Sequence, residues 1–161
     1  MSYETSSGPQ RHETEAEQAD RNFNELLQEL RVSQMGVQIL FAFLLTLAFQ
    51  ERFTDVTDTQ LVIYVITLLL CAMATALLIA PVALHRALFR KGRKRQVVET
   101  ASKLAKGGLL MLFLAICGAI LFILDFLLSR TLALVLTGVV AVVFLALWYV
   151  VPFGAARSTA R

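Results

Sequence analysis

The fold is decided by residues 107–153, which read GGLLMLFLAICGAILFILDFLLSRTLALVLTGVVAVVFLALWYVVPF. Asp125 and Arg130 are the only charged residues in this stretch. The turn at Arg130 divides it into two apolar segments, residues 107–129 and 131–153. A helix needs about 20 apolar residues to cross the roughly 30 Å hydrocarbon core of a bilayer. The stretch therefore predicts two membrane-spanning helices joined in a tight hairpin.

Two more apolar segments, residues 32–50 and 61–84, precede this hairpin and contain no charged residue. Apolar residues make up 57% of the chain and charged residues 17%, against about 45–50% and about 25% in soluble domains. Hydrocarbon offers backbone groups no hydrogen-bond partner, so each span must be a helix or part of a closed barrel. The alternation that is typical of barrel strands is absent. The sequence predicts an all-α membrane four-helix bundle over residues 22–161.

The N-terminal residues differ from the rest in composition. Residues 1–21 are polar and acidic, and they are expected to form a disordered tail. Residues 22–25 (NFNE) have the form of a helix-capping box. Apolar residues then follow at helical spacing, namely Phe23, Leu26, Leu27 and Leu30. This pattern predicts a short amphipathic helix, either lying on the membrane surface or continuous with the first span; the lack of Pro or Gly before Gly36 favours continuity.

Lysine and arginine residues indicate the orientation of the chain. Residues 85–106, between the second and third spans, contain eight of them, whereas the two other connections contain one each, Arg52 and Arg130. Connections rich in these residues stay on the cytoplasmic side. Four crossings then place both termini in the cytoplasm, and the expected location is the inner (plasma) membrane of the cell.

The same connection holds a dense cationic cluster beside the membrane. Its members are Arg86, Arg90, Lys91, Arg93, Lys94 and Arg95. Such clusters attract anionic phospholipids, although topology control alone also accounts for them. Nucleic acid is not an expected partner, because the stretch has one aromatic residue, Phe89, and no folded module around it. Residues 97–104 follow with an amphipathic pattern that predicts an interfacial helix.

Polar residues near the inner end of the first span form a second candidate site. Arg31, Gln34 and Gln38 follow one another at helical spacing. Amides inside a bilayer need partners, and hydrogen bonds between helices supply them. The alternative is a polar vestibule at the inner face, completed by His85 and Arg86.

Asp125 is the only carboxylate in the four apolar segments. Acidic residues within a membrane are candidates for function. Asp125 is the nineteenth residue after Lys106, which places it near the outer interface. At that depth it meets water or pairs with Arg130 across the turn.

Small residues and cysteines also occur inside the spans. Small residues recur every fourth position, which allows close helix contacts; they are Ala72, Ala76, Ala80, Ala115, Ala119, Ala133, Thr137 and Ala141. Cys71 and Cys117 lie near the middle of spans without a Cys-x-x-Cys motif or a Cys/His cluster. They are interpreted as small apolar side chains, and no cofactor or metal is expected.

Two motifs resemble those of a known family. One is residues 24–32 (NELLQELRV) with Gln34, Gly36 and Gln38, and the other is Ala80-Pro81-x3-His85-Arg86-x2-Phe89-Arg90. Both are similar to motifs in a family of small four-span bacterial membrane proteins, common in actinobacteria, whose function is unknown. The resemblance implies a four-span architecture and a bacterial origin. Some members carry the label of sodium/proton antiporter.

These observations favour a multi-pass accessory or interaction protein of the bacterial cell membrane. The alternative, a small cation/proton (sodium:proton) antiporter, needs a carboxylate that both ions reach from either side. Gln34 and Gln38 cannot titrate, and Asp125 lies near one edge. No catalytic constellation is visible, so the chain is not expected to be an enzyme. The expected partners are the bilayer with its anionic phospholipids, and a second copy or another membrane protein.

Overall fold

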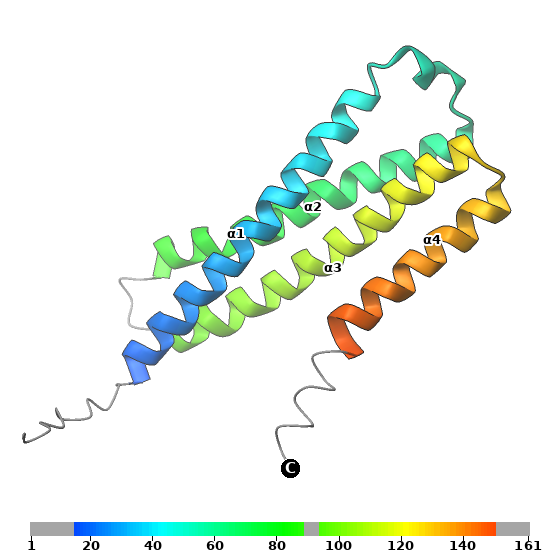
Figure 1. The fold of residues 1–161 in the computed structure, drawn as a ribbon. Coiled ribbons are helices and arrows are strands. Elements are labelled where there is room, and N and C mark those ends of the chain that lie inside the picture. The colour runs from blue at the N-terminus through cyan, green and yellow to red at the C-terminus, as the bar shows by residue number, and fades with distance from the viewer. Residues whose placement is uncertain (1–14, 89–93, 151–161) are drawn as a thin grey trace, which may run out of the picture.

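The computed structural model describes residues 15–88 and 94–150, and no strand occurs among them. Four long helices follow one another along the chain (Figure 1). The elements are α1 (Glu15–Leu47), the 3₁₀-helix η1 (Glu51–Asp55), α2 (Asp58–Leu88), α3 (Lys94–Leu127), α4 (Arg130–Leu145) and the π-helical turn η3 (Ala146–Val150). The predicted all-α architecture with four long helices is confirmed.

Four segments, one along each long helix, are long and apolar enough to cross a membrane, and the fourth continues from α4 into η3. These segments are Glu25–Leu47, Asp58–Leu84, Val98–Leu127 and Arg130–Trp148. Their length and composition suggest a multi-pass membrane protein. The segments overlap the four predicted spans, although their ends differ from the predicted ones.

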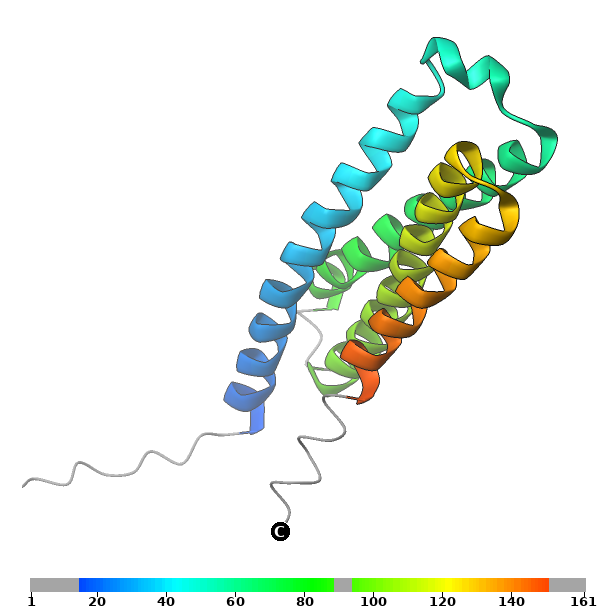
Figure 2. The same ribbon diagram turned by 45° about the vertical axis from the view of Figure 1, so that its right-hand side comes forward.

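The helices do not contribute equally to the bundle. α1, α2 and α3 contact one another, whereas α4 packs mainly on α3. Figures 1 and 2 show α4 on the side of α3 that faces away from α1. The beginning of α1 and the end of α4 lie at one end of the bundle, and η1 and the turn between α3 and α4 lie at the other. The predicted four-helix bundle is therefore a three-helix core with a peripheral fourth helix.

The core follows from a seven-residue repeat in α1 and from close packing of α2 against α3. α1 buries Phe23, Leu30, Val37 and Leu44, which are spaced seven residues apart. This repeat keeps one face of a helix turned toward its neighbours. Along α2 and α3, a Cβ atom placed on Gly118 would overlap Oγ1 of Thr67 in α2. The absence of a side chain at Gly118 thus lets the two helices approach closely.

The N-terminal segment differs from its prediction. α1 begins at Glu15 rather than at Asn22, so residues 15–21, expected to belong to the disordered tail, are helical. Residues 1–14 lie outside the described residues. α1 then continues without a break to Leu47, so the amphipathic segment and the first span are one helix.

The amphipathic face of α1 packs on protein. Phe23 and Ala101 of α3 form a small buried cluster, with Leu26, Leu27, Leu84 and Val98 packed around it. Residues 97–104 are correspondingly the first turns of α3 rather than a separate interfacial helix. Two amphipathic segments that cover each other remove their apolar faces from water, which explains why neither needs the membrane surface.

The small residues of the spans lie on two kinds of surface. α4 buries Ala133 and Thr137, and Ala115 of α3 is fully buried. Ala72 and Ala76 of α2 are instead exposed. Their spacing therefore marks close helix packing in α3 and α4 but not in α2.

Candidate functional site

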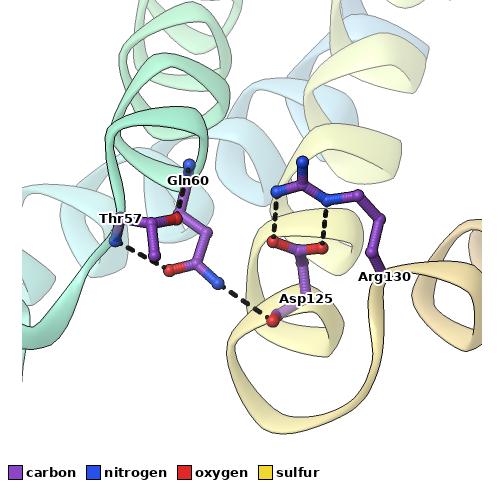
Figure 3. A network of polar contacts seen from close by, with 4 residues as sticks. All are labelled: Thr57, Gln60, Asp125 and Arg130. Carbon is purple, nitrogen blue, oxygen red and sulfur yellow. Dashed lines mark hydrogen bonds and ion pairs between the residues drawn. The ribbon is translucent and has the colours of Figure 1, made fainter.

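A network of four polar residues lies at the end of the bundle that contains η1 and the turn between α3 and α4 (Figure 3). The network begins with Thr57 and Gln60 at the start of α2. The Thr57 backbone N–H donates to Oε1 of Gln60 at 3.0 Å, and the Gln60 N–H donates to Oγ1 of Thr57 at 3.4 Å. This reciprocal pattern is a capping box, which satisfies N–H groups that lack partners at a helix start.

Gln60 also joins α2 to α3. Its Nε2 donates to the backbone carbonyl of Asp125 at 2.9 Å, and the Gln60 side chain is buried. The last four carbonyls of a helix have no partner within that helix, and Asp125 lies in the last turn of α3. One side chain therefore satisfies groups at the start of α2 and at the end of α3.

The carboxylate of Asp125 is held by Arg130, the first residue of α4. Arg130 Nε donates to Oδ1 at 3.0 Å and Nη2 donates to Oδ2 at 3.1 Å. The side chain of Asp125 is 4% exposed and that of Arg130 is 53% exposed. Two-point pairing of this kind fixes both distance and orientation. Of the two predicted surroundings for Asp125, water or Arg130, the structure has the pair with Arg130.

Charge at these helix ends explains why the pair is needed. A carboxylate is unfavourable at a helix C-terminus, and a cation is unfavourable at a helix N-terminus. Asp125 and Arg130 occupy these two positions, and each offsets the other. The network thus links α2, α3 and α4 through hydrogen bonds at one end of the bundle.

An aromatic cluster lies close to this network. Tyr64 of α2 contacts Phe53 of η1 with ring centroids 5.0 Å apart and Phe122 of α3 at 5.6 Å. The Tyr64 hydroxyl donates to the carbonyl of Leu44 at 2.9 Å, in the last turn of α1. Tyr64 therefore binds a backbone carbonyl in the last turn of α1, as Gln60 binds one in the last turn of α3.

A groove of about 530 Å³ opens beside the aromatic cluster. Phe53, Phe122 and Phe126 are among the residues that line it. The guanidinium of Arg52 lies 5.6 Å from the centre of the Phe126 ring, a cation–π contact. The groove thus combines aromatic walls with a charged rim.

The predicted polar cluster near the other end of α1 is only partly described. Gln34 Nε2 donates to the carbonyl of Leu78 in α2 at 2.7 Å. That carbonyl lies in the turn before Pro81, which is buried within α2. Pro81 has no N–H to donate to the carbonyl of Leu77, four residues earlier, and Leu78 is the next residue along this disturbed turn. Side chains of neighbouring helices bind backbone carbonyls near such prolines in membrane proteins. Gln34 therefore joins two helices, as the first of the two predicted roles requires.

Gln38 and Arg31 are exposed, on a part of the α1 surface that does not face the core. The side chains of His85 and Arg86 lie outside the described residues. A polar vestibule formed by all five residues stays a prediction.

The predicted lipid-binding cluster also lies largely outside the described residues. This holds for Arg90, Lys91 and Arg93 and for the side chains of Arg86, Lys94 and Arg95. Contact with anionic phospholipids stays a prediction. Cys71 is buried and Cys117 half-buried, and both are free thiols. Within the described ranges, no group of three or more His, Cys, Asp or Glu residues is placed to hold a metal ion.

Comparison with known protein families gives a match over most of the chain. A family of unknown function, DUF6328, matches residues 12–152. The chain belongs to this family. Membership in DUF6328 agrees with the resemblance found in the sequence motifs, and it supplies no activity. No curated protein and no solved structure matches the chain.

Three residues that bind free backbone groups at the helix ends of this DUF6328 protein were not singled out from the sequence: Thr57, Gln60 and Tyr64. Thr57-Asp58-Thr59-Gln60 precedes an apolar segment and has the spacing of a capping box, so this signal was available for Thr57 and Gln60. Tyr64 lies near the start of the predicted span 61–84, and no role was predicted for it. Nothing in the sequence pairs it with Leu44, because that contact depends on how α1 and α2 are rotated about their axes.

Proposed function

We propose that this DUF6328 member is an accessory or interaction protein of the bacterial plasma membrane, which acts through contacts and neither catalyses a reaction nor carries ions. The observation that supports this proposal is that the carboxylate of Asp125 is enclosed and paired with Arg130. Both of its carboxylate oxygens bind Arg130. The polar groups Gln34, Gln60 and Tyr64 are likewise engaged in contacts that join helices.

The second candidate function, a sodium/proton antiporter, requires Asp125 to be free to exchange a proton for a cation. An exchanger needs a carboxylate that releases a proton and binds a cation in turn, with access from both sides. A guanidinium bound to both oxygens competes with the cation for the same positions. Asp125 also lies two residues from the end of α3, far from the middle of the span.

The proposed orientation places both termini and the basic segment 85–106 in the cytoplasm. Its basis is the bias of Lys and Arg toward that segment. Anionic phospholipids are the proposed partners of the cationic cluster. α4 and the second half of α1 expose large apolar side chains, a surface that suits lipid tails and other membrane helices.

A transport assay separates the two candidate functions. The full chain would be reconstituted in liposomes that contain a pH-sensitive dye and would then receive pulses of sodium or potassium. We expect no proton movement above that of empty liposomes. Asp125→Asn is the test variant, and Asp58→Asn is the matched control, because Asp58 is an exposed carboxylate at the start of α2. Exchange that is lost in Asp125→Asn and kept in Asp58→Asn would establish the antiporter instead.

A further inference from the structure

α1 has a second face that no described part of the chain covers. Its first face, the one with Phe23, Leu30, Val37 and Leu44, packs into the bundle. A second row of residues runs along the exposed side at alternating spacings of four and three: Arg31, Met35, Gln38, Ala42 and Leu45. Figure 2 shows α1 at the edge of the bundle, with α2 and α3 on one side of it. We call this row the outer seam of α1.

Gln38 is the residue of the outer seam that does not suit lipid. It lies about 10 Å along the helix from Arg31 and about 14 Å from the end of α1 at Leu47, by the rise of about 1.5 Å per residue. These lengths place its amide deep in the hydrocarbon layer. The side chain is exposed and makes no hydrogen bond among the described residues. An amide in an apolar medium without a partner is costly.

We propose that the outer seam of α1 binds the outer seam of a second copy of this chain, in parallel, around a twofold axis along the membrane normal. In such a pair, each residue near the axis faces its own counterpart. An amide carries both a donor and an acceptor, so the two Gln38 side chains satisfy each other by donating Nε2–H to the partner's Oε1. This inference goes beyond the proposed function, because it holds whether or not the protein carries ions.

The neighbours of Gln38 suit such a contact. Ala42, one turn along the seam, is small and lets two helix backbones approach. Met35 and Leu45 flank the amide and are 52% and 43% exposed, so they are free to pack against a partner. Arg31 lies toward the end of the span, where its long side chain reaches the headgroups and keeps the two cations apart.

α4 also has an exposed face, and comparing it with the outer seam explains why we place the dimer contact on α1. That face is also apolar and exposed, with Val135, Val139 and Val142 more than half exposed. Lipid tails satisfy side chains of this kind. They cannot satisfy an amide, so the outer seam of α1 has a chemical need for a partner that α4 lacks.

Self-association would be measured by energy transfer between labelled copies of the full chain in phosphatidylethanolamine/phosphatidylglycerol vesicles, over a range of protein-to-lipid ratios. We expect a dimer whose dissociation constant rises about tenfold in Gln38→Leu, the loss expected for interhelical amide hydrogen bonds. Gln38→Asn keeps an amide and should retain most of the affinity. Val139→Leu on α4 is the control and should leave it unchanged. Because Gln38 makes no hydrogen bond within the described chain, Gln38→Leu should melt at the temperature of the unchanged protein when both are diluted in detergent to monomers.

Cysteine crosslinking gives an independent readout. Oxidation of Ala42→Cys in vesicles should yield a covalent dimer, and oxidation of Val139→Cys should yield much less. A monomer at every ratio, a dimer that Gln38→Leu leaves equally strong, or equal crosslinking at both positions would overturn the proposal. A monomer in pure lipid that crosslinks to a different protein in native membranes would assign the seam to that protein and also reject self-association.

Discussion

At the scale of single residues, Asp125 and Arg130 differ in their access to the surroundings. The carboxylate is almost fully enclosed, whereas half of the arginine side chain is exposed. Removing one member of an ion pair costs most when the other is left buried without a partner. Arg130 can turn outward when it loses its partner, but Asp125 cannot. The two substitutions should therefore differ in their cost.

We expect Arg130→Gln to destabilise the protein by about 1–3 kcal/mol, within the usual cost of an unsatisfied buried group. Asp125→Asn should cost less, because the exposed arginine that remains is free to be solvated. The free energies of unfolding of both single variants and of the double variant, measured in detergent, check this order. A double variant that loses the sum of the two single effects would show that the pair contributes no coupling.

Sequence distance explains which of these contacts could be predicted. Asp125 and Arg130 are five residues apart across a short turn, so their pairing could be predicted as one of two alternatives. Gln34 and Leu78 are 44 residues apart, and their contact depends on the rotation of α1 and α2 about their axes. Hydropathy does not report that rotation, because lipid-facing and helix-facing residues are similarly apolar.

At the scale of helices, contacts between α2 and α3 depend on small side chains at defined places. Gly118 faces Thr67, whose hydroxyl donates to the Ile63 carbonyl at 2.7 Å within α2. Gly138 of α4 has no atom within 4 Å of the position that a Cβ would take. Both glycines lie inside helices, where alanine is intrinsically better by up to about 1 kcal/mol.

Gly118→Ala should therefore destabilise the protein by about 1–3 kcal/mol through overpacking, and Gly138→Ala should leave it unchanged or slightly more stable. Thermal unfolding of the two variants, followed by circular dichroism, compares them directly. Equal behaviour of the two would mean that α2 and α3 do not approach as closely as described.

A second prediction at this scale concerns the joint between α2 and α3. Gln60→Leu keeps the approximate volume but removes the bond from the Thr57 N–H to the Gln60 side chain and the bond to the Asp125 carbonyl. The other half of the capping box, from the backbone N–H of residue 60 to Thr57, remains. We therefore expect a loss of about 1–3 kcal/mol. Gln50→Leu is the control, because Gln50 is exposed and its side chain makes no hydrogen bond in the described structure. If Gln60→Leu loses no more stability than the control, Gln60 does not stabilise the contact between α2 and α3.

At the scale of the whole molecule, the arrangement of the helix ends agrees with an even number of crossings. The start of α1 and the end of α4 lie together, and η1 and the hairpin turn lie at the opposite end. The four apolar segments predicted the four long helices, because a helix that crosses a bilayer needs an apolar segment of this length. They did not give the peripheral place of α4, since an apolar helix suits lipid and protein equally. The buried contact of Phe23 with Ala101 was missed because it joins two segments that each read as amphipathic on their own.

The central claim is that the chain crosses the membrane four times with both ends in the cytoplasm. Two reporters test it most directly: one that is active only in the cytoplasm, fused after Arg161, and one that is active only outside, inserted beside Asp55 in η1. We predict that both are active, and that each is silent when the two reporters are exchanged. A reporter after Arg161 that is active only outside would contradict the four-span account.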